Sequence, residues 1–222
     1  MNRLPHAPAI TLILAACLAP LLTACSSTGI ALNEAFGYAK REQLVDRVQS
    51  AKQGQEAARE QFADALEEFM AVTQAQGGEL ERVYNRLKSQ LDRCESRADT
   101  VSSRIDSVEN VAAALFREWE KELADYQSDS LRSSSELQLR QTRAEYNTLI
   151  TAMKRAEATM EPVLQAFRDQ VLFLKHNLNA RAVASLQNEV GAIESEVQSL
   201  IAEMNASINE ANAFIDSMNR NN

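Results

Sequence analysis

Apolar residues recur at alternating spacings of four and three along nearly the whole chain after residue 43. The longest of these stretches runs from Leu80 to Tyr126, and Glu122 is its only charged repeat position. A seven-residue repeat kept over this length predicts helices that supercoil against partner helices. The repeat therefore restricts the chain to an all-α fold of long, packed helices.

Turn-forming residues are too scarce for a β fold. The 222 residues include 6 Gly and 4 Pro, and only Pro162 lies beyond residue 25. A β-sandwich or barrel needs a turn about every 8–12 residues. Most of the chain consists of residues with high helix propensity, such as Ala, Glu, Leu and Arg, so composition supports the same prediction.

Four heptad stretches follow one another, separated by breaks. Residues 77–78 (Gly-Gly) end the first and residues 127–130 end the second. A capping box at residues 133–136 is expected to begin the third helix. If residues 176–179 break the chain again, the four stretches have nearly equal lengths, and the fold is an elongated antiparallel coiled-coil bundle of four helices. If they do not, the bundle has three helices, and the last is very long.

Three irregularities interrupt the apolar seam. Pro162 lies beside a stutter at residues 163–171, which predicts a kink in the third helix. Gln55 and Glu122 are polar repeat positions. They either set the register of the helices, as a buried Asn does in coiled coils, or lie near a solvated end.

The first 24 residues have the features of a bacterial lipoprotein signal peptide. Arg3 precedes an apolar segment, residues 9–22, that is too short to span a membrane. The segment ends on Leu-Thr-Ala-Cys at residues 22–25, which is the lipobox pattern. We expect cleavage between Ala24 and Cys25 and a diacylglycerol on the Cys25 thiol.

Two alternatives compete with this interpretation. One is an ordinary secretory signal with an incidental cysteine. The other is cleavage at a second lipobox-like sequence, residues 14–17. Cleavage there would leave a short apolar segment and an apolar mature end, so we favour Cys25.

The lipobox also predicts localisation. Residues 25–32 would form a lipidated tether and residues 33–222 the helical domain. Ser26 stands where aspartate commonly retains a lipoprotein in the inner membrane, so in a Gram-negative host we expect the chain to face the periplasm from the outer membrane. Two or more acyl chains give stable anchoring.

The sequence offers no candidate catalytic residue, cofactor site or metal site. His176 is the only histidine after the signal segment, and it lacks the Glu-x-x-His pairing of di-iron bundles. Cys94 falls on an apolar repeat position, which favours a buried thiol. Phosphate loops, nucleophile elbows and zinc-protease motifs are absent from the sequence. We therefore expect a protein that is not an enzyme.

The charge balance argues against nucleic acid as a partner. Lys and Arg total 23 against 31 Asp and Glu, and the basic residues are scattered among acidic ones. Nucleic-acid binding needs clustered basic residues that displace counterions.

Two blocks of sequence resemble a bacterial envelope family of unknown function. Residues 37–48 (GYAKREQLVDRV) and 55–62 (QEAAREQF) are similar to the opening of domain-of-unknown-function family 2959. Residues 171–180 (VLFLKHNLNA) are similar to its other distinctive stretch. The resemblance implies a helical envelope protein and supplies no mechanism.

The two blocks contain polar residues that would meet if the first and third helices end near each other. These are Lys40 and Arg41 in the first block, and His176 and Asn177 in the last. A polar contact between them is therefore an expectation that the fold can test.

Two functional hypotheses follow. The first is a non-enzymatic, lipid-anchored helical bundle that binds or spaces protein partners in the periplasm, or associates with itself. The second is a membrane-interacting effector or pore-type module whose amphipathic helices rearrange. A hydrophobic hairpin would support the second hypothesis, and the sequence after the signal segment contains none.

Overall fold

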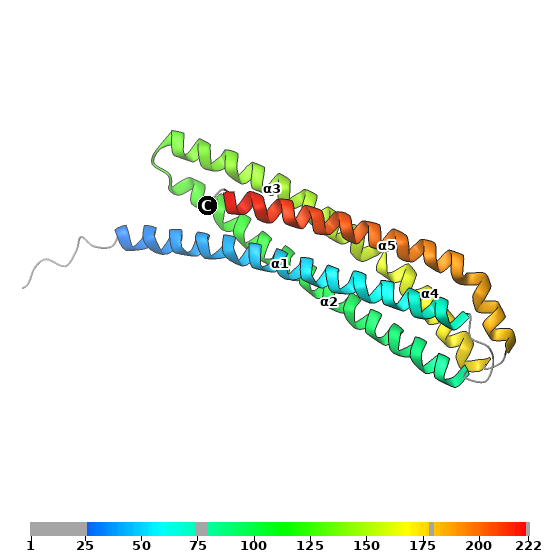
Figure 1. Ribbon diagram of the computed structural model, residues 1–222. Coiled ribbons are helices and arrows are strands. Elements are labelled where there is room, and N and C mark those ends of the chain that lie inside the picture. The colour runs from blue at the N-terminus through cyan, green and yellow to red at the C-terminus, as the bar shows by residue number, and fades with distance from the viewer. Residues whose placement is uncertain (1–25, 74–79, 178–179, 221–222) are drawn as a thin grey trace, which may run out of the picture. The chain divides into compact units, whose positions relative to one another are not determined.

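The computed structural model describes residues 26–73, 80–177 and 180–220, and these residues are almost entirely helical (Figure 1). They form five α-helices and one short 3-10 helix: α1 (Ser26–Thr73), α2 (Leu80–Glu122), η1 (Leu123–Asp125), α3 (Asp129–Ala158), α4 (Met160–His176) and α5 (Ala180–Arg220). No strand occurs within these ranges. The all-α prediction is confirmed.

The chain divides into two units, residues 1–36 and residues 37–222. The described part of the first unit is the beginning of α1, which includes the segment expected to act as a tether. The second unit contains the bundle.

Four helical arms make up the bundle: α1, α2, α3 with α4, and α5. Contacts between α1 and α5 fix their relative direction. Lys52 Nζ donates to Asn212 Oδ1 at 3.0 Å, and Arg59 Nη1 donates to Asn205 Oδ1 at 2.7 Å. Sequence position rises along α1 as it falls along α5, so these arms are antiparallel, as an up-down-up-down bundle requires.

The third and fourth arms are separate helices. α4 ends at His176, and α5 begins at Ala180. The Asn177 amide nitrogen Nδ2 donates to the Phe173 carbonyl at 3.0 Å, which satisfies an acceptor that the end of α4 leaves unpaired. The four-helix prediction is confirmed, and the three-helix alternative is wrong.

The third arm breaks at Thr159, close to the predicted kink. Pro162 has no N–H to donate to the Ala158 carbonyl, and its ring crowds that carbonyl. The helical ladder therefore stops at Ala158 and resumes at Met160. At the break, the Thr159 hydroxyl donates to the Ala156 carbonyl at 2.8 Å.

α3 begins earlier than predicted. Its N-cap is Ser128, whose hydroxyl accepts a hydrogen bond from the Leu131 amide at 3.4 Å. The predicted capping box at residues 133–136 is wrong, because the helix has already begun at Asp129, which places Ser133 inside it. Ser135 is buried and accepts a bond from Trp119. Ser128 followed by Asp129 supplies both a cap and an acidic first turn.

The heptad seam forms the core almost as the sequence predicts. Every repeat position of the first stretch is buried, including Gln55. In the second stretch Val83 is buried in place of Tyr84, which is half-buried. Tyr126 was expected in the seam and is 39% exposed, because α2 ends at Glu122 and the chain turns away through η1.

Candidate functional site

The residues predicted to carry the membrane anchor, Ala24 and Cys25, lie outside the described residues. Ser26, the predicted sorting residue, is the first residue of α1. The first described side chain of α1, Lys40, lies at the end of the bundle formed by the α2–α3 connection, where it pairs with Glu118 of α2. This end is the part of the described structure closest along the chain to the predicted lipid.

A polar cluster joins three arms at this end. Lys40 Nζ forms an ion pair with Glu118 Oε2. The Arg41 guanidinium carbon lies 4.5 Å from the centroid of the Trp119 ring. The Trp119 indole N–H donates to Ser135 Oγ at 2.8 Å. These contacts connect α1, α2 and α3, and we call the five residues the end cluster.

The side chains of the end cluster are partly buried from solvent. Burial lowers the pKa of the Arg41 guanidinium, and burial followed by the charge of Glu118 raises the pKa of Glu122. A guanidinium stacked on an indole keeps part of its stabilisation when water is removed. Arg41 therefore covers the end of the apolar seam, whose next buried residue on α1 is Leu44.

The expected contact between Lys40 or Arg41 and His176 or Asn177 is wrong. α1 and the α3–α4 arm run parallel, so the beginning of one lies at the opposite end of the bundle from the end of the other. Asn177 instead caps α4, and His176 is exposed beside it.

The outer face near the end of α4 exposes two large apolar side chains. Leu172 is 55% exposed and Phe173 is 38% exposed. Sequence reasoning placed both outside the seam but assigned them no role.

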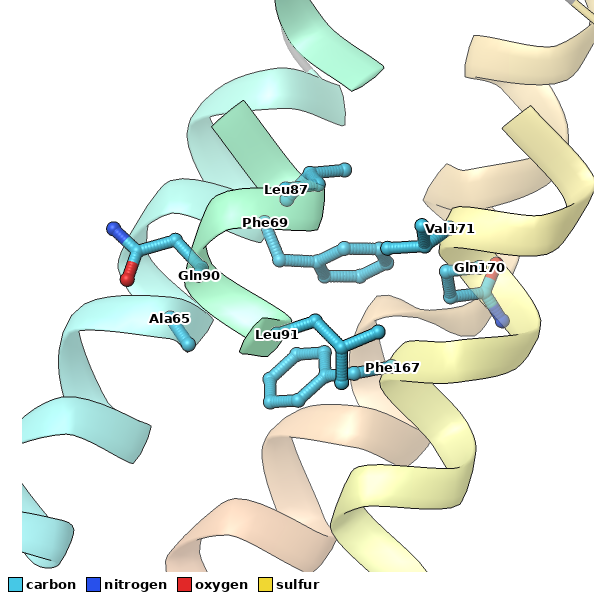
Figure 2. Close-up of a pocket in the computed structure, with 8 residues that line it drawn as sticks. All are labelled: Ala65, Phe69, Leu87, Gln90, Leu91, Phe167, Gln170 and Val171. Carbon is cyan, nitrogen blue, oxygen red and sulfur yellow. The ribbon is translucent and has the colours of Figure 1, made fainter. Parts of the chain in front are cut away.

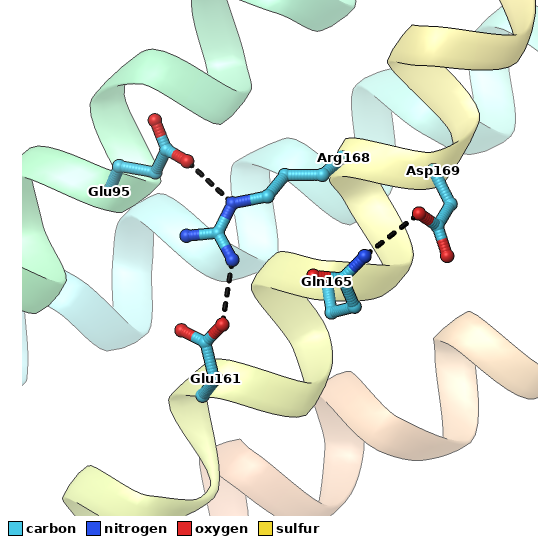
Figure 3. A network of polar contacts seen from close by, with 5 residues as sticks. All are labelled: Glu95, Glu161, Gln165, Arg168 and Asp169. Atoms are coloured by element: carbon cyan, nitrogen blue, oxygen red, sulfur yellow. Dashed lines mark hydrogen bonds and ion pairs between the residues drawn. The ribbon is translucent and has the colours of Figure 1, made fainter.

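An open groove lies beside the α3–α4 break, and Arg168 and two carboxylates are among the groups that line it. Figure 3 shows the contacts of this arginine. Arg168 Nε donates to Glu95 Oε1 of α2, and its Nη1 donates to Glu161 Oε1, both at 2.7 Å. The neighbouring Gln165 amide donates to Asp169 Oδ1 at 2.8 Å. The hydrogen bonds that Arg168 donates to the two glutamates raise the pKa of its guanidinium. The Glu95–Arg168 pair joins α2 to α4, and Glu161 and Asp169 are bonded within α4, so these three acids do not form an unpaired acidic site.

A small cavity lies between α1, α2 and α4 (Figure 2). Its volume is about 10 Å³, and Phe69, Leu87, Leu91 and Phe167 supply most of its apolar wall. This volume is at the lower limit for one water molecule. The cavity is a packing imperfection and not a ligand pocket.

A buried polar pair crosses the core between α1 and α5. Ser207 Oγ donates to Gln55 Oε1 at 2.8 Å, and both side chains are fully buried. Gln55 Nε2 has no hydrogen-bond partner in the structure. The pair supports the register interpretation of Gln55, because any slip between α1 and α5 would leave both groups unpaired.

We expect Ser207→Ala to lower the free energy of unfolding by about 1–3 kcal/mol, since it leaves the whole Gln55 amide buried and unsatisfied. Adding Gln55→Leu should restore most of the loss, because both polar partners are then replaced by apolar groups. Urea unfolding of the two variants measures the difference. A double variant less stable than Ser207→Ala would contradict this account.

Cys94 is the free cysteine of the described chain, and it is buried as predicted. Its thiol contacts the Gln61 carbonyl with Sγ and oxygen 3.7 Å apart. Burial raises the pKa of the thiol to about 12. Cys94 is therefore a core residue and not a nucleophile.

Sequence reasoning missed a close contact between α1 and α2. Arg104 Nη1 donates to the Ser50 carbonyl at 2.7 Å. A Cβ atom on Gly54 would lie 3.0 Å from Arg104 Cδ. The glycine in the middle of α1 therefore makes room for the arginine, which no sequence pattern indicates.

Within the ranges that the structure describes, no group of three or more His, Cys, Asp or Glu side chains is arranged to hold a metal ion. None of the helices there combines the length and the apolar character needed to cross a membrane.

Comparison with known protein families gives a match over most of the chain. The family model described as "Protein of unknown function (DUF2959)" matches residues 30–218. No curated protein and no solved structure matches the chain. The match covers both blocks that resemble this family in the sequence.

Proposed function

Because the chain belongs to the DUF2959 family, whose description assigns no activity, we propose its role from its own residues. It is a non-enzymatic bacterial envelope lipoprotein, anchored through Cys25, whose helical bundle binds or spaces protein partners in the periplasm. The observation that carries this proposal is the lipobox at residues 22–25 directly after a signal-like apolar segment.

The ion pairs that acidic side chains form with neighbouring helices support a non-enzymatic role. Glu118 pairs with Lys40, and Glu120 Oε1 accepts from Arg143 Nη1 at 2.7 Å. Glu109 Oε2 lies 2.8 Å from Lys154 Nζ. Exposed pairs of this kind add little stability individually. They nevertheless engage these carboxylates with neighbouring helices, which leaves them unsuited to acid–base catalysis.

The core supports a role as a firm spacer or scaffold. The seam is largely apolar on all four arms, apart from buried polar residues such as Gln55 and Ser207, and α5 alone is 41 residues long, which corresponds to about 60 Å of helix. A protein of this kind presents its outer helical faces to partners, and binding energy at such faces concentrates in a few residues.

The test is the anchor residue. We expect Cys25→Ala to abolish labelling with radioactive palmitate and to leave the chain unprocessed, because Cys25 is the proposed site of both modification and cleavage. Labelled wild-type chain should fractionate with the outer membrane of a Gram-negative host.

The matched control is Cys17→Ala, which removes the other lipobox-like cysteine and should leave labelling unchanged. Palmitate that persists in Cys25→Ala, or labelled wild-type chain found mainly in the inner membrane, would contradict the proposed anchor or the proposed location respectively.

A further inference from the structure

The end of the bundle at the α2–α3 connection leaves apolar side chains of the seam uncovered. Leu131 is 59% exposed and Tyr126 is 39% exposed, while Leu123 packs partly against the core. Tyr126 continues the heptad repeat of α2. Leu131 lies one helical turn before Ser135, whose side chain faces the core. We call Leu123, Tyr126 and Leu131 the seam-end patch.

Tyr126 is exposed because it lies on the turn after η1, and Leu131 is exposed because α5 stops short of it. Ser217, close to the end of α5, donates to Glu145 Oε2 at 2.6 Å. Glu145 lies almost four helical turns after Leu131 along α3, so the first turns of α3 extend past the described end of α5, as Figure 1 shows. The seam therefore continues beyond its fourth helix.

We propose that the seam-end patch rests on the lipid bilayer that anchors the chain, with Tyr126 and Leu131 at headgroup depth. The inference relies on the proposed lipid at Cys25. Lys40, at this end, follows Cys25 by 15 residues along the chain, whereas Thr73, at the other end, follows it by 48 residues. The lipid is thus joined to the patch end by the shorter path.

The chemistry of the patch suits a membrane interface. Tyr and Trp have an apolar ring and a polar tip, and both concentrate where a bilayer meets water. Arg41, stacked on Trp119 behind the patch, adds a cation with an apolar contact face. The Asp129 carboxylate beside Leu131 is neutralised by Arg132 at 2.9 Å.

Charge alone does not provide the attachment, because acidic side chains surround the patch as well as basic ones. Apolar insertion of two side chains is weak by itself. A lipid anchor, however, holds the patch near the bilayer at an effective concentration on the order of millimolar. The surface that covers the patch is therefore the bilayer in which the lipid anchor is inserted.

The chain contains a single tryptophan, Trp119, which makes the contact measurable. Trp119 is bonded to Ser135, about 6 Å along α3 from Leu131. We expect phosphatidylcholine vesicles brominated near the headgroup to quench Trp119 fluorescence of the reconstituted, lipidated chain by roughly half. The quenching should be the same with anionic phosphatidylglycerol present and at high salt.

Paired variants locate the contact. The double variant Tyr126→Ser with Leu131→Ser should lose most of the quenching. Leu172→Ser with Phe173→Ser removes one leucine and one aromatic of similar exposure at the far end of the bundle, and it should retain the quenching. Because all four side chains are exposed, both double variants should unfold at wild-type temperature.

Absent quenching in the wild type, or equal loss in both double variants, would overturn the inference. Quenching or burial of the patch that disappears when chains are diluted below one per vesicle would identify a second copy as the occupant instead. Failure of lipidation is detected separately, by the mass of the N-terminal peptide. In that case a Cys17→Ser chain is coupled at Cys25 to a maleimide phospholipid, and quenching of its Trp119 fluorescence tests whether the patch contacts the bilayer.

Discussion

Ile105→Asp should destabilise the bundle by about 4 kcal/mol or more. Ile105 is 1% exposed in the longest heptad stretch, surrounded by the apolar core. The substitution removes a buried aliphatic side chain and puts an uncompensated carboxylate in its place. A loss of this size is a large part of the stability of a domain, so thermal and urea unfolding should shift markedly or the chain should fail to fold.

The pH dependence of this variant separates charge from volume. The introduced carboxyl can avoid part of the cost by binding a proton, so its folded-state pKa lies above the unfolded value. The deficit relative to wild type should therefore be smaller at pH 4 than at pH 7. Ser103→Asp, on the exposed face of the same helix, should change stability by less than about 0.5 kcal/mol. Similar losses in the two variants would mean that the heptad stripe of α2 is not the core.

The seam was predictable because burial in a bundle follows the helical period. Val48 and Leu200, for example, are buried together with their heptad neighbours three and four positions away. The break before α5 was predictable from arm lengths, since an unbroken helix would have exposed its apolar stripe.

The ends of the helices were less predictable. Several Ser and Asp residues around position 130 can each cap a helix, and only the Trp119–Ser135 bond shows which of them is buried instead. Leu131 was expected in a connection and proves to lie in the first turn of α3. The exposure of Tyr126 depends on where α2 ends, and that of Leu131 on where α5 ends relative to α3, neither of which the repeat in a single helix encodes.

In the candidate site, too, local features were predictable from the sequence and contacts between distant segments were not. The lipobox is a local sequence pattern, so Cys25 could be proposed from the chain alone. The end cluster depends on contacts between distant segments. Nothing local in Arg41 or Trp119 indicates that the two side chains stack, and the expected contact with His176 failed because parallel arms begin and end at opposite ends.

Phe69→Ala should cost about 3–5 kcal/mol. Phe69 is fully buried in α1, and its ring meets Phe167 of α4 edge-on with centroids 6.3 Å apart (Figure 2). The small cavity already beside these rings shows that the surrounding side chains do not close gaps completely, so truncation should leave a void instead of a repacked core.

A double-mutant cycle with Phe167→Leu isolates the ring contact from the cavity. The coupling energy between the two positions should be about 0.5–1.5 kcal/mol, the range found for edge-to-face aromatic pairs. Phe173→Ala removes the same kind of side chain from an exposed position on α4 and should shift the urea midpoint only slightly. If Phe69→Ala were as mild as Phe173→Ala, α1 and α4 would not share a packed core. The α3–α4 arm would then be free to separate from α1, as the rearranging-helix hypothesis requires, and the firm spacer would lose its physical basis.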